Sequence, residues 1–584
     1  PVPDLDRTDR LLILGANPAV SNGSLMTAPD VKARCKAIRA RGGKVIVIDP
    51  RRTETAALAD EHHAIRPGGD AALLLAMVHV LFADGLVRLG AAAGHVTGLA
   101  EVEAIAARFA PARVAARVGL APEVIRRLAH DHAAAASAAC YGRIGTTCQE
   151  FGTLASWAVD LVNVLTGNLD RAGGAMWTTP AALPGRHRAR ADARFGRYAS
   201  RVRGLPEMFG ELPVATLADE LAGGEVRALV TIAGNPLVSA PGTGALTEAM
   251  AGLEFRLAID PYVNATTRLA DVILPPPSPL ARAHYDLALY QLAIRNVARY
   301  SPPTVASAAG APAEWEILLT LAKGITGMAA APLAMADDVV ARELVARELA
   351  DLAAAGTPAP VDLAGALALL DGRGPDRLVD ALVRLGPYGD GLGARPGGLT
   401  LAALRAAPHG LDLGPLVPSL PDVLRTADRR IALAPAAIVA DLPRLEAAVA
   451  APVPALVLIG RRDLRSNNSW MHNLPPLMKG RDRCTLIMHP DDAAARGLVD
   501  GAAARVASAA GEVLAPVEIS DEVRPGVVSL PHGFGHDLAG VRMAVARAHA
   551  GVNVNRVSDP AFVDAPSHNA AFNGVPVDVR PASP

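Results

Sequence analysis

The chain has 584 residues, and its 57 Lys and Arg against 58 Asp and Glu leave a formal net charge of −1 at pH 7. This balance argues against a surface built for nucleic acid or anionic membranes, and no apolar run reaches the roughly 18 residues of a membrane span. The length exceeds what one hydrophobic core usually supports, so we expect a soluble protein of about three or four domains.

The four cysteines are Cys35, Cys140, Cys148 and Cys484, and none belongs to a C-x-x-C pair. Local spacing therefore favours neither a zinc knuckle nor an iron–sulfur cluster. Unpaired thiols are typical of a reducing compartment, so a cytoplasmic protein is expected. A periplasmic location stays open, because the sequence starts at Pro1 without a methionine and is expected to be the remainder of a longer chain.

The first predicted unit is a β-α-β arrangement in residues 1–60. An apolar run ends at a Gly-Ala-Asn-Pro turn, a basic amphipathic helix follows, and a second apolar run ends at Asp49. Such runs are typical of buried parallel strands, whose carboxyl ends bind ligands in open α/β sheets. Glycine lets the backbone approach a phosphate, and an asparagine amide can both donate and accept hydrogen bonds. A strand-end aspartate can accept hydrogen bonds from ribose hydroxyls or a guanine edge.

Residues 229–275 repeat this plan, with a Gly-Asn-Pro turn after the first apolar run and Asp260 at the end of the second. The copies then keep register, because Asp49 and Asp60 are eleven residues apart, as are Asp260 and Asp271. A threonine, a leucine and an alanine also match within that span. The matched pair predicts two nucleotide-like ligands. An ordinary Rossmann-like sheet without a ligand is the alternative.

The stretch between the two copies adds polar groups near the first half-site. Arg51 and Arg52 follow the strand-end aspartate, where they could clamp a pyrophosphate, although solvated surface charges would look the same. Asp70 is predicted as the N-cap of an apolar helix. Residues 142–149 form a Gly- and Thr-rich loop after an apolar strand, again at a strand's carboxyl end.

Five motifs follow one another along the chain: Gly-Ala-Asn-Pro, Ile-Asp-Pro-Arg-Arg-Thr-Glu-Thr, Leu-Thr-Gly-Asn-Leu-Asp-Arg-Ala-Gly-Gly, Ala-Gly-Asn-Pro and Ala-Asp-Val-Ile-Leu-Pro. This ordered set resembles the molybdopterin oxidoreductase family, the DMSO reductase superfamily that includes formate dehydrogenases and nitrate reductases. The resemblance covers nearly the whole chain. It implies a bis-molybdopterin guanine dinucleotide cofactor with Mo or W, which agrees with two nucleotide half-sites.

The same resemblance implies a set of cofactor-binding residues and no metal ligand among them. The first half-site and its loop would supply Gly15, Asn17, Pro18, Asp49, Arg51, Thr53, Gly68, Asp70, Gly142, Arg143, Thr146 and Gln149. The second half-site would supply Gly234, Asn235, Pro236 and Asp260. The family's C-terminal cap domain closes over both pterins, and its contacts here would be Arg461, Arg465, Ser466, Asn468, His472, His532, Asn553 and Asn555.

The predicted fold is α/β, with two Rossmann-like nucleotide-binding units related by a pseudo-repeat and a C-terminal small β-barrel cap domain. The expected domains are residues 1–175 for the first unit, 176–450 for the second unit with a helical extension, and 451–584 for the cap. His284 lies where relatives place a segment near the cofactor and is the one catalytic candidate.

An Arg-rich segment either lines a funnel for an anionic substrate or is a solvated loop. Its arginines are Arg186, Arg188, Arg190, Arg194 and Arg197.

The resemblance implies a two-electron oxidation or reduction of a small substrate such as formate or nitrate, with the chemistry supplied by the cofactor. Relatives carry an N-terminal segment with the metal-ligating Cys, selenocysteine or Ser and often a [4Fe–4S] cluster. Nothing before Asp9 matches it, so roughly 100–200 residues are expected to be absent. An iron–sulfur or flavin electron-transfer subunit is an expected partner, whereas nucleic acid and membrane insertion are not.

Two alternatives stay open. One is a non-catalytic relative with the same fold and no pterin, like the large peripheral-arm subunit of respiratory complex I. The intact asparagine and aspartate in both half-sites argue against it. The other is an unrelated NAD- or thiamine-type α/β enzyme. A full G-x-G-x-x-G is missing, which disfavours the NAD enzyme, and neither explains the shared register of the copies.

Overall fold

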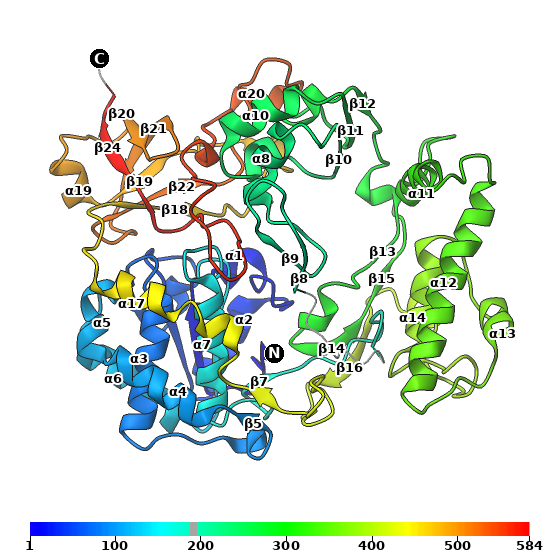
Figure 1. Ribbon diagram of the computed structural model, residues 1–584, viewed down its shortest axis with the longest axis horizontal. Coiled ribbons are helices and arrows are strands. Elements are labelled where there is room, and N and C mark those ends of the chain that lie inside the picture. Colours follow the sequence, from blue (N-terminus) through cyan, green and yellow to red (C-terminus); the bar gives the residue numbers. More distant parts are fainter. Residues whose placement is uncertain (187–194, 583–584) are drawn as a thin grey trace.

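The computed structural model describes residues 1–186 and 195–582. Its first unit, drawn in blue and cyan in Figure 1, contains a four-stranded parallel sheet of strand order β4-β3-β2-β6. The strands are β2 (Arg10–Leu14), β3 (Lys44–Ile48), β4 (Glu61–His63) and β6 (Ala138–Gly142). All of β2 is buried, because it lies in the sheet interior between β3 and β6. This confirms the predicted buried parallel strand.

Helices cover both faces of this sheet, as the alternation of side chains along β2 shows. Leu12 and Leu14 pack into a large core on one face, whereas Leu11 and Ile13 pack into a second core on the other. The second core includes α2 (Val31–Ala40). The large core includes α3 (Asp70–Ala83), α4 (Leu99–Ala106), α5 (Pro111–Val118), α6 (Pro122–Ala134) and α7 (Gly152–Leu165).

The second unit is a three-stranded parallel sheet of order β10-β11-β12. Its elements are β10 (Ala228–Ile232), β11 (Phe255–Ile259), β12 (Val272–Ile273), α8 (Leu217–Ala222), α9 (Pro236–Ser239) and α10 (Thr243–Ala251). The buried strand predicted at β10 is wrong, since Val230 is 47% and Ile232 53% exposed. β10 is an edge strand, and only the face that carries Leu229 packs against the core with α8 and α10.

A helical extension follows the second unit and stands to the right in Figure 1. It consists of α11 (Glu314–Ile325), α12 (Leu333–Ala354), α13 (Leu363–Ala368), α14 (Pro375–Leu385) and α15 (Leu401–Arg405). Two short antiparallel pairs accompany it, β13 (His284–Tyr285) with β15 (Tyr300–Ser301) and β14 (Arg295–Ala298) with β16 (Leu411–Pro415). No helix within residues 1–186 and 195–582 is long and apolar enough to cross a membrane.

The C-terminal domain contains one mixed sheet of order β23-β18-β22-β19-β21-β20-β24, which lies above the first unit in Figure 1. Its strands are β18 (Val457–Arg461), β19 (Leu486–Met488), β20 (Ala503–Ala507), β21 (Glu512–Ile519), β22 (Val527–Pro531), β23 (Val575–Pro576) and β24 (Asp578–Pro581). The predicted small β-barrel is corrected to a curled half-barrel. Its end strands β23 and β24 do not pair with each other, and β23 has only two residues with which to close a ladder.

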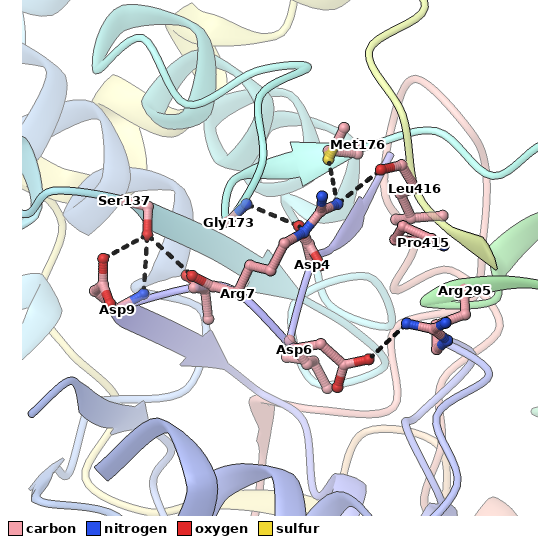
Figure 2. A network of polar contacts seen from close by, with 12 residues as sticks. Asp4, Asp6, Arg7, Asp9, Ser137, Gly173, Met176, Arg295, Pro415 and Leu416 are labelled. Carbon is pink, nitrogen blue, oxygen red and sulfur yellow. Dashed lines mark hydrogen bonds and ion pairs between the residues drawn. The ribbon is translucent and has the colours of Figure 1, made fainter. Parts of the chain in front are cut away.

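The N-terminal segment joins the first unit to the chain just after β16 through a network of polar contacts (Figure 2). Asp4 is 1% exposed and accepts hydrogen bonds from Arg7 Nε at 2.5 Å and from the Gly173 amide at 2.8 Å. Arg7 in turn donates to the Leu416 carbonyl at 2.7 Å. A single buried carboxylate therefore organises contacts among three distant parts of the chain.

Asp4→Ala is expected to lower the free energy of unfolding by about 2–3 kcal/mol, because it leaves the buried Gly173 amide without an acceptor. Urea unfolding followed by far-UV circular dichroism measures the change. Asp578→Ala is the matched control, since its ion pair with Arg580 is exposed and should contribute less than about 0.5 kcal/mol. Equal losses in the two variants would contradict the assigned role of Asp4.

Candidate functional site

A cavity of about 550 Å³ lies between the carboxyl edge of the first sheet and the C-terminal domain. Many of the predicted cofactor residues meet there, although they come from both ends of the chain. The first unit contributes Gly15, Asn17, Asp49, Arg51, Thr53, Gly68 and Asp70. The C-terminal domain contributes Arg461, Ser466, Asn468 and His532.

The turn after β2 is held by its asparagine. Asn17 Oδ1 accepts a hydrogen bond from Thr55 Oγ1 at 2.7 Å, and Asn17 Nδ2 donates to Glu54 at 2.7 Å. In the second unit Asn235 Oδ1 accepts from Thr266 Oγ1 at the same 2.7 Å. The matched threonines of the repeat therefore orient the two asparagines in the same way.

The matched aspartates of the repeat also make equivalent backbone contacts. Asp49 accepts from the Arg51 amide at 2.9 Å, and Asp260 accepts from the Tyr262 amide at 2.8 Å. Each of these contacts closes the turn that follows the strand.

Eleven residues further on, Asp60 and Asp271 accept from the amides of Val45 and Arg256, at 2.8 and 2.7 Å. These amides belong to the start of β3 and of β11. The shared register therefore has a structural cause, because each pair of aspartates ties down both ends of one strand.

The left-handed position of the two turns is Gly15 in the first unit and Ala233 in the second, with φ of +54° and +52°. A Cβ on Gly15 would lie 2.8 Å from the Thr146 amide nitrogen and 2.9 Å from Gly145 Cα. Gly15 is thus required for both its conformation and its close approach to the loop at residues 142–149. Gly234 stands one residue later and has a negative φ, so the glycine of the second motif does not take the same role.

Two carboxyl groups of the cavity have raised pKa values. Burial raises the pKa of Asp49 to about 7 and that of Asp70 to about 6. The predicted N-cap role of Asp70 is wrong, since Asp70 is the first residue of α3 and Gly69 precedes it as the cap. Its carboxylate instead accepts from Gln149 Nε2 at 2.9 Å, and Gln149 Oε1 is buried without a hydrogen-bond partner in the described part of the chain.

Arg461 at the end of β18 presents a fixed positive charge to the cavity. Its guanidinium donates to the carbonyls of Ser529 and Thr485, at 2.5 and 2.8 Å. Burial and then the like charge of Arg51 lower the pKa of Arg461 to about 10. Two guanidinium groups from different domains therefore face one cavity, an arrangement that an anion between them would stabilise.

A chain of buried side chains lies behind the C-terminal wall of the cavity. Ser466 Oγ and His472 Nε2 are 2.8 Å apart, and His472 Nδ1 and His536 Nε2 are also 2.8 Å apart. Burial lowers the pKa of His472 to about 3 and that of His536 to about 4, so both rings are neutral near pH 7. His472 therefore supports Ser466 from behind and does not itself line the cavity.

The remaining predicted residues of the first unit and cap lie outside the lining of the cavity. Thr146 and Gln149 are buried behind it, and Arg465 is exposed on the loop after β18. The others in this group are Pro18, Gly142 and Arg143.

The second half-site is contacted by the C-terminal domain in a different way. Asn553 Nδ2 donates to the Leu237 carbonyl at 2.8 Å, and Asn555 Nδ2 donates to the Val238 carbonyl at 2.5 Å. Both asparagines are buried and hold the backbone of α9, so their amides are already engaged. The cofactor-binding residues predicted for the second half-site itself lie just after β10 and β11. They are Gly234, Asn235, Pro236 and Asp260.

Nothing in this geometry supports catalysis by His284, which is exposed in β13 and absent from the lining of the cavity. In the Arg-rich segment, Arg188, Arg190 and Arg194 lie outside the described residues. Arg197 is paired with Glu207 at 2.6 Å and is therefore not free to attract an anion. Within the described residues, no cluster of three or more His, Cys, Asp or Glu side chains could hold a metal ion.

Some lining residues were missed by the sequence analysis. Gly145 packs against Gly15 and accounts for the shape of the turn, a role that its place in a Gly-rich loop hints at. Asn573 accepts from the Gly460 amide at 3.2 Å and donates to the Cys148 carbonyl at 3.2 Å. It links two domains at the cavity, and no local sequence pattern marks it.

Comparison with known proteins identifies the family of the chain. Residues 1–278 match the family model "Molybdopterin oxidoreductase", and residues 456–576 match "Molydopterin dinucleotide binding domain". Formate dehydrogenase H of Escherichia coli is 32% identical over 289 residues, which are 47% of this chain and 39% of that protein. The assimilatory nitrate reductase catalytic subunit of Bacillus subtilis is 24% identical over 296 residues, or 47% of this chain and 40% of that protein.

The matched part thus spans about two fifths of the length of these relatives. Among solved structures, acetylene hydratase from Pelobacter acetylenicus superposes with a TM-score of 0.72 at 17% identity. That superposition covers 100% of this chain and 79% of the other, and it shows a common fold. The chain therefore belongs to the molybdopterin oxidoreductase family, is distantly homologous to formate dehydrogenases and nitrate reductases, and carries the family's dinucleotide-binding domain at residues 456–576.

Proposed function

We propose that the chain binds bis-molybdopterin guanine dinucleotide with Mo or W and oxidises or reduces a small substrate by two electrons, with formate as the first candidate and nitrate as the second. The observation that carries this proposal is the cavity between the first unit and the C-terminal domain. When bound, the cofactor supplies the two-electron chemistry at its metal. The chain's own part is to hold and orient the dinucleotide.

The residues of the cavity fit a guanine dinucleotide. Arg51 and Arg461 provide facing positive charges for a pyrophosphate. Asp49 and Asp70 provide carboxylates of the kind that accept hydrogen bonds from the N1–H and N2–H of guanine. Gln149 lies behind the cavity wall, where its Nε2 donates to Asp70 and orients that carboxylate, while its Oε1 has no hydrogen-bond partner among the described residues.

Retention of the cofactor is expected to depend on pH through Asp49. The N–H donors of guanine bind the ionised carboxylate more strongly than the protonated one. Binding therefore lowers the pKa of Asp49 from its value of about 7 in the unliganded chain. The affinity for the cofactor is then highest above pH 7, where Asp49 is ionised. It decreases as pH falls through 7, by up to about tenfold per pH unit. The fraction of GMP retained after dialysis between pH 8 and pH 5.5 measures this. Asp49→Asn should bind more weakly and show a flat profile, and an unchanged slope in that variant would refute the assignment.

The test of the proposed function is acid release of GMP together with Mo and W analysis of the intact gene product. About two GMP and one metal atom per chain are expected for a bis-dinucleotide cofactor. Dye-linked oxidation of formate and reduction of nitrate then distinguish the two substrates. Absence of GMP from correctly matured protein would overturn the proposal in favour of a non-catalytic relative, like the large complex I subunit.

An electron-transfer partner follows from this proposal, because electrons taken from a substrate must leave the cofactor. We infer an iron–sulfur or flavin subunit in that role, as expected from the sequence resemblance. Co-purification of the tagged chain from its native host, followed by absorbance spectra of the complex, is the direct measurement. Isolation of an active chain without any redox partner would count against such a subunit.

A further inference from the structure

A second cavity, of about 380 Å³, lies at the junction between the first unit and the C-terminal domain. Pro67 lines both this cavity and the dinucleotide cavity, so the two are neighbours separated by the Pro67–Gly68 turn. Its apolar walls include Val457 and Phe562 of the C-terminal domain. The residues proposed to bind the dinucleotide have no assigned role in this second cavity.

Three arginines from separate segments converge on this junction. Arg66 and Arg117 of the first unit line the cavity, whereas Arg524 precedes the lining residue Pro525 and reaches the junction beside Arg66, over Gly119. A Cβ placed on Gly119 would lie 2.5 Å from Arg524 Nη1 and 2.8 Å from Arg66 Cγ. Both side chains therefore cross the same glycine, where an added Cβ would displace at least one of them and the φ of +73° would strain any other residue.

These three arginines are half-buried, and their hydrogen-bonding groups are only partly satisfied. The Nε atoms of Arg66, Arg117 and Arg524 are all buried without a hydrogen-bond partner among the described residues. Arg524 Nη1 donates to the Ala64 carbonyl at 2.7 Å, which supplies no negative charge. Within residues 1–186 and 195–582, neither Arg66 nor Arg524 has a carboxylate within 4 Å.

The carboxylates near the cavity already pair with other groups. Glu150 lies 3.9 Å from Arg117 but only 3.1 Å from Arg444, so it is shared between two arginines. Asp492 pairs with Arg496 at 3.3 Å and accepts from the Gly526 amide at 2.6 Å. The junction therefore holds more positive charge than its own carboxylates neutralise.

Two of the three arginines have lowered pKa values. Burial, and then the like charge of Arg66, lower the pKa of Arg524 below its usual value. Burial also lowers the pKa of Arg117, and Glu150 opposes that change only in part. Desolvated like charges of this kind are stabilised when an anion binds between them.

We propose that Arg66, Arg117 and Arg524 form a second anion site, distinct from the dinucleotide cavity, which binds a small phosphate-bearing molecule at the junction of the two domains. Guanidinium groups match phosphate in geometry and charge through paired N–H donors. The volume suits a small ligand with an apolar part against Val457 and Phe562. Because its arginines come from both domains, the bound anion also holds the C-terminal domain against the first unit.

The experiment is isothermal titration of the cofactor-loaded protein with inorganic phosphate and pyrophosphate, at an ionic strength held constant with sodium chloride. Saturable binding is expected for the wild-type chain. Arg66→Gln and Arg524→Gln should each weaken it by about tenfold or more. Arg66→Lys keeps the charge and should give an intermediate loss, which separates anion binding from a folding defect. The matched control is Arg227→Gln, because that side chain is 73% exposed in the second unit.

Three results would overturn the proposal. The first is the absence of saturable phosphate binding to the wild-type protein. The second is phosphate binding that survives Arg66→Gln but is lost in Arg461→Gln, which would place the anion in the dinucleotide cavity. The third is tighter binding of succinate than of phosphate, which would identify a dicarboxylate ligand instead.

Discussion

Replacing Gly15 by alanine is expected to lower the free energy of unfolding by about 3 kcal/mol and, under the proposed function, to abolish retention of GMP at the first half-site. The added Cβ meets only backbone atoms, with Thr146 N at 2.8 Å and Gly145 Cα at 2.9 Å. Backbone cannot rotate aside as a flexible side chain would, and the left-handed φ of +54° adds strain for alanine. The loop of residues 142–149 must therefore move away from the turn that holds Asn17.

GMP content and chemical denaturation of the variant measure both effects. The repeat offers a reciprocal control, because Ala233 occupies the same left-handed position with φ of +52°. Ala233→Gly relieves that strain and is expected to stabilise the chain by about 1 kcal/mol. If both substitutions changed stability in the same direction, the equivalence of the two positions would be refuted.

His472→Leu is expected to lower the free energy of unfolding by about 3–4 kcal/mol, because the substitution leaves two buried polar groups without partners. The hydroxyl of Ser466 and Nε2 of His536 each lose a contact of 2.8 Å. Leucine preserves much of the side-chain volume, so the loss reflects hydrogen bonding more than a cavity. His549→Gln is the control, since that half-buried ring pairs at 3.0 Å with Asp482, whose side chain is 78% exposed.

The difference between His472→Leu and the wild type is itself expected to depend on pH. In the folded chain the His472 pKa is about 3, whereas an unfolded histidine titrates near about 6.5. A depressed pKa contributes stability that is complete above pH 6.5 and is lost as pH falls toward 3, by up to about 1.4 kcal/mol per pH unit. The advantage of the wild type should therefore shrink below pH 6.5.

Asp49 and Asp70 act in the opposite direction, because their pKa values are raised. They are present in both proteins, and their effects cancel in the comparison. Urea unfolding of the two proteins at several pH values provides the test. A difference that stayed constant from pH 8 to pH 5 would show that His472 is not held neutral by burial.

The sequence predicted the repeat because the repeat rests on local contacts. Asp49 and Asp60 fix the two ends of β3, and Asp260 and Asp271 do the same for β11, so an eleven-residue register is needed in each copy. Arg461 was predicted through the resemblance to the family, and the structure places it at the end of β18 in the lining of the cavity. In the repeat, the chemistry of a residue and its neighbours in the chain determine its place.

Features that depend on distant segments could not be predicted in this way. The apolar pattern of β10 predicts a buried strand, but its actual exposure depends on which elements pack against the second sheet. Asn553 and Asn555 were identified as cofactor contacts, yet their amides hold α9, because the C-terminal domain docks there. Arg66 and Arg524 are separated by most of the chain, and only folding brings them over Gly119.

The edge position of β10 makes the two halves of the repeat unequal in dynamics. Amides of β2 lie between two paired strands, so they can exchange with solvent only when the first sheet opens as a whole. β10 has one paired neighbour and an exposed outer face, and local fraying is enough to release its amides. Slow hydrogen exchange at the first half-site and fast exchange at the second would therefore accompany nearly identical turn geometry, so that the turn after β2 is rigid and the turn after β10 is compliant.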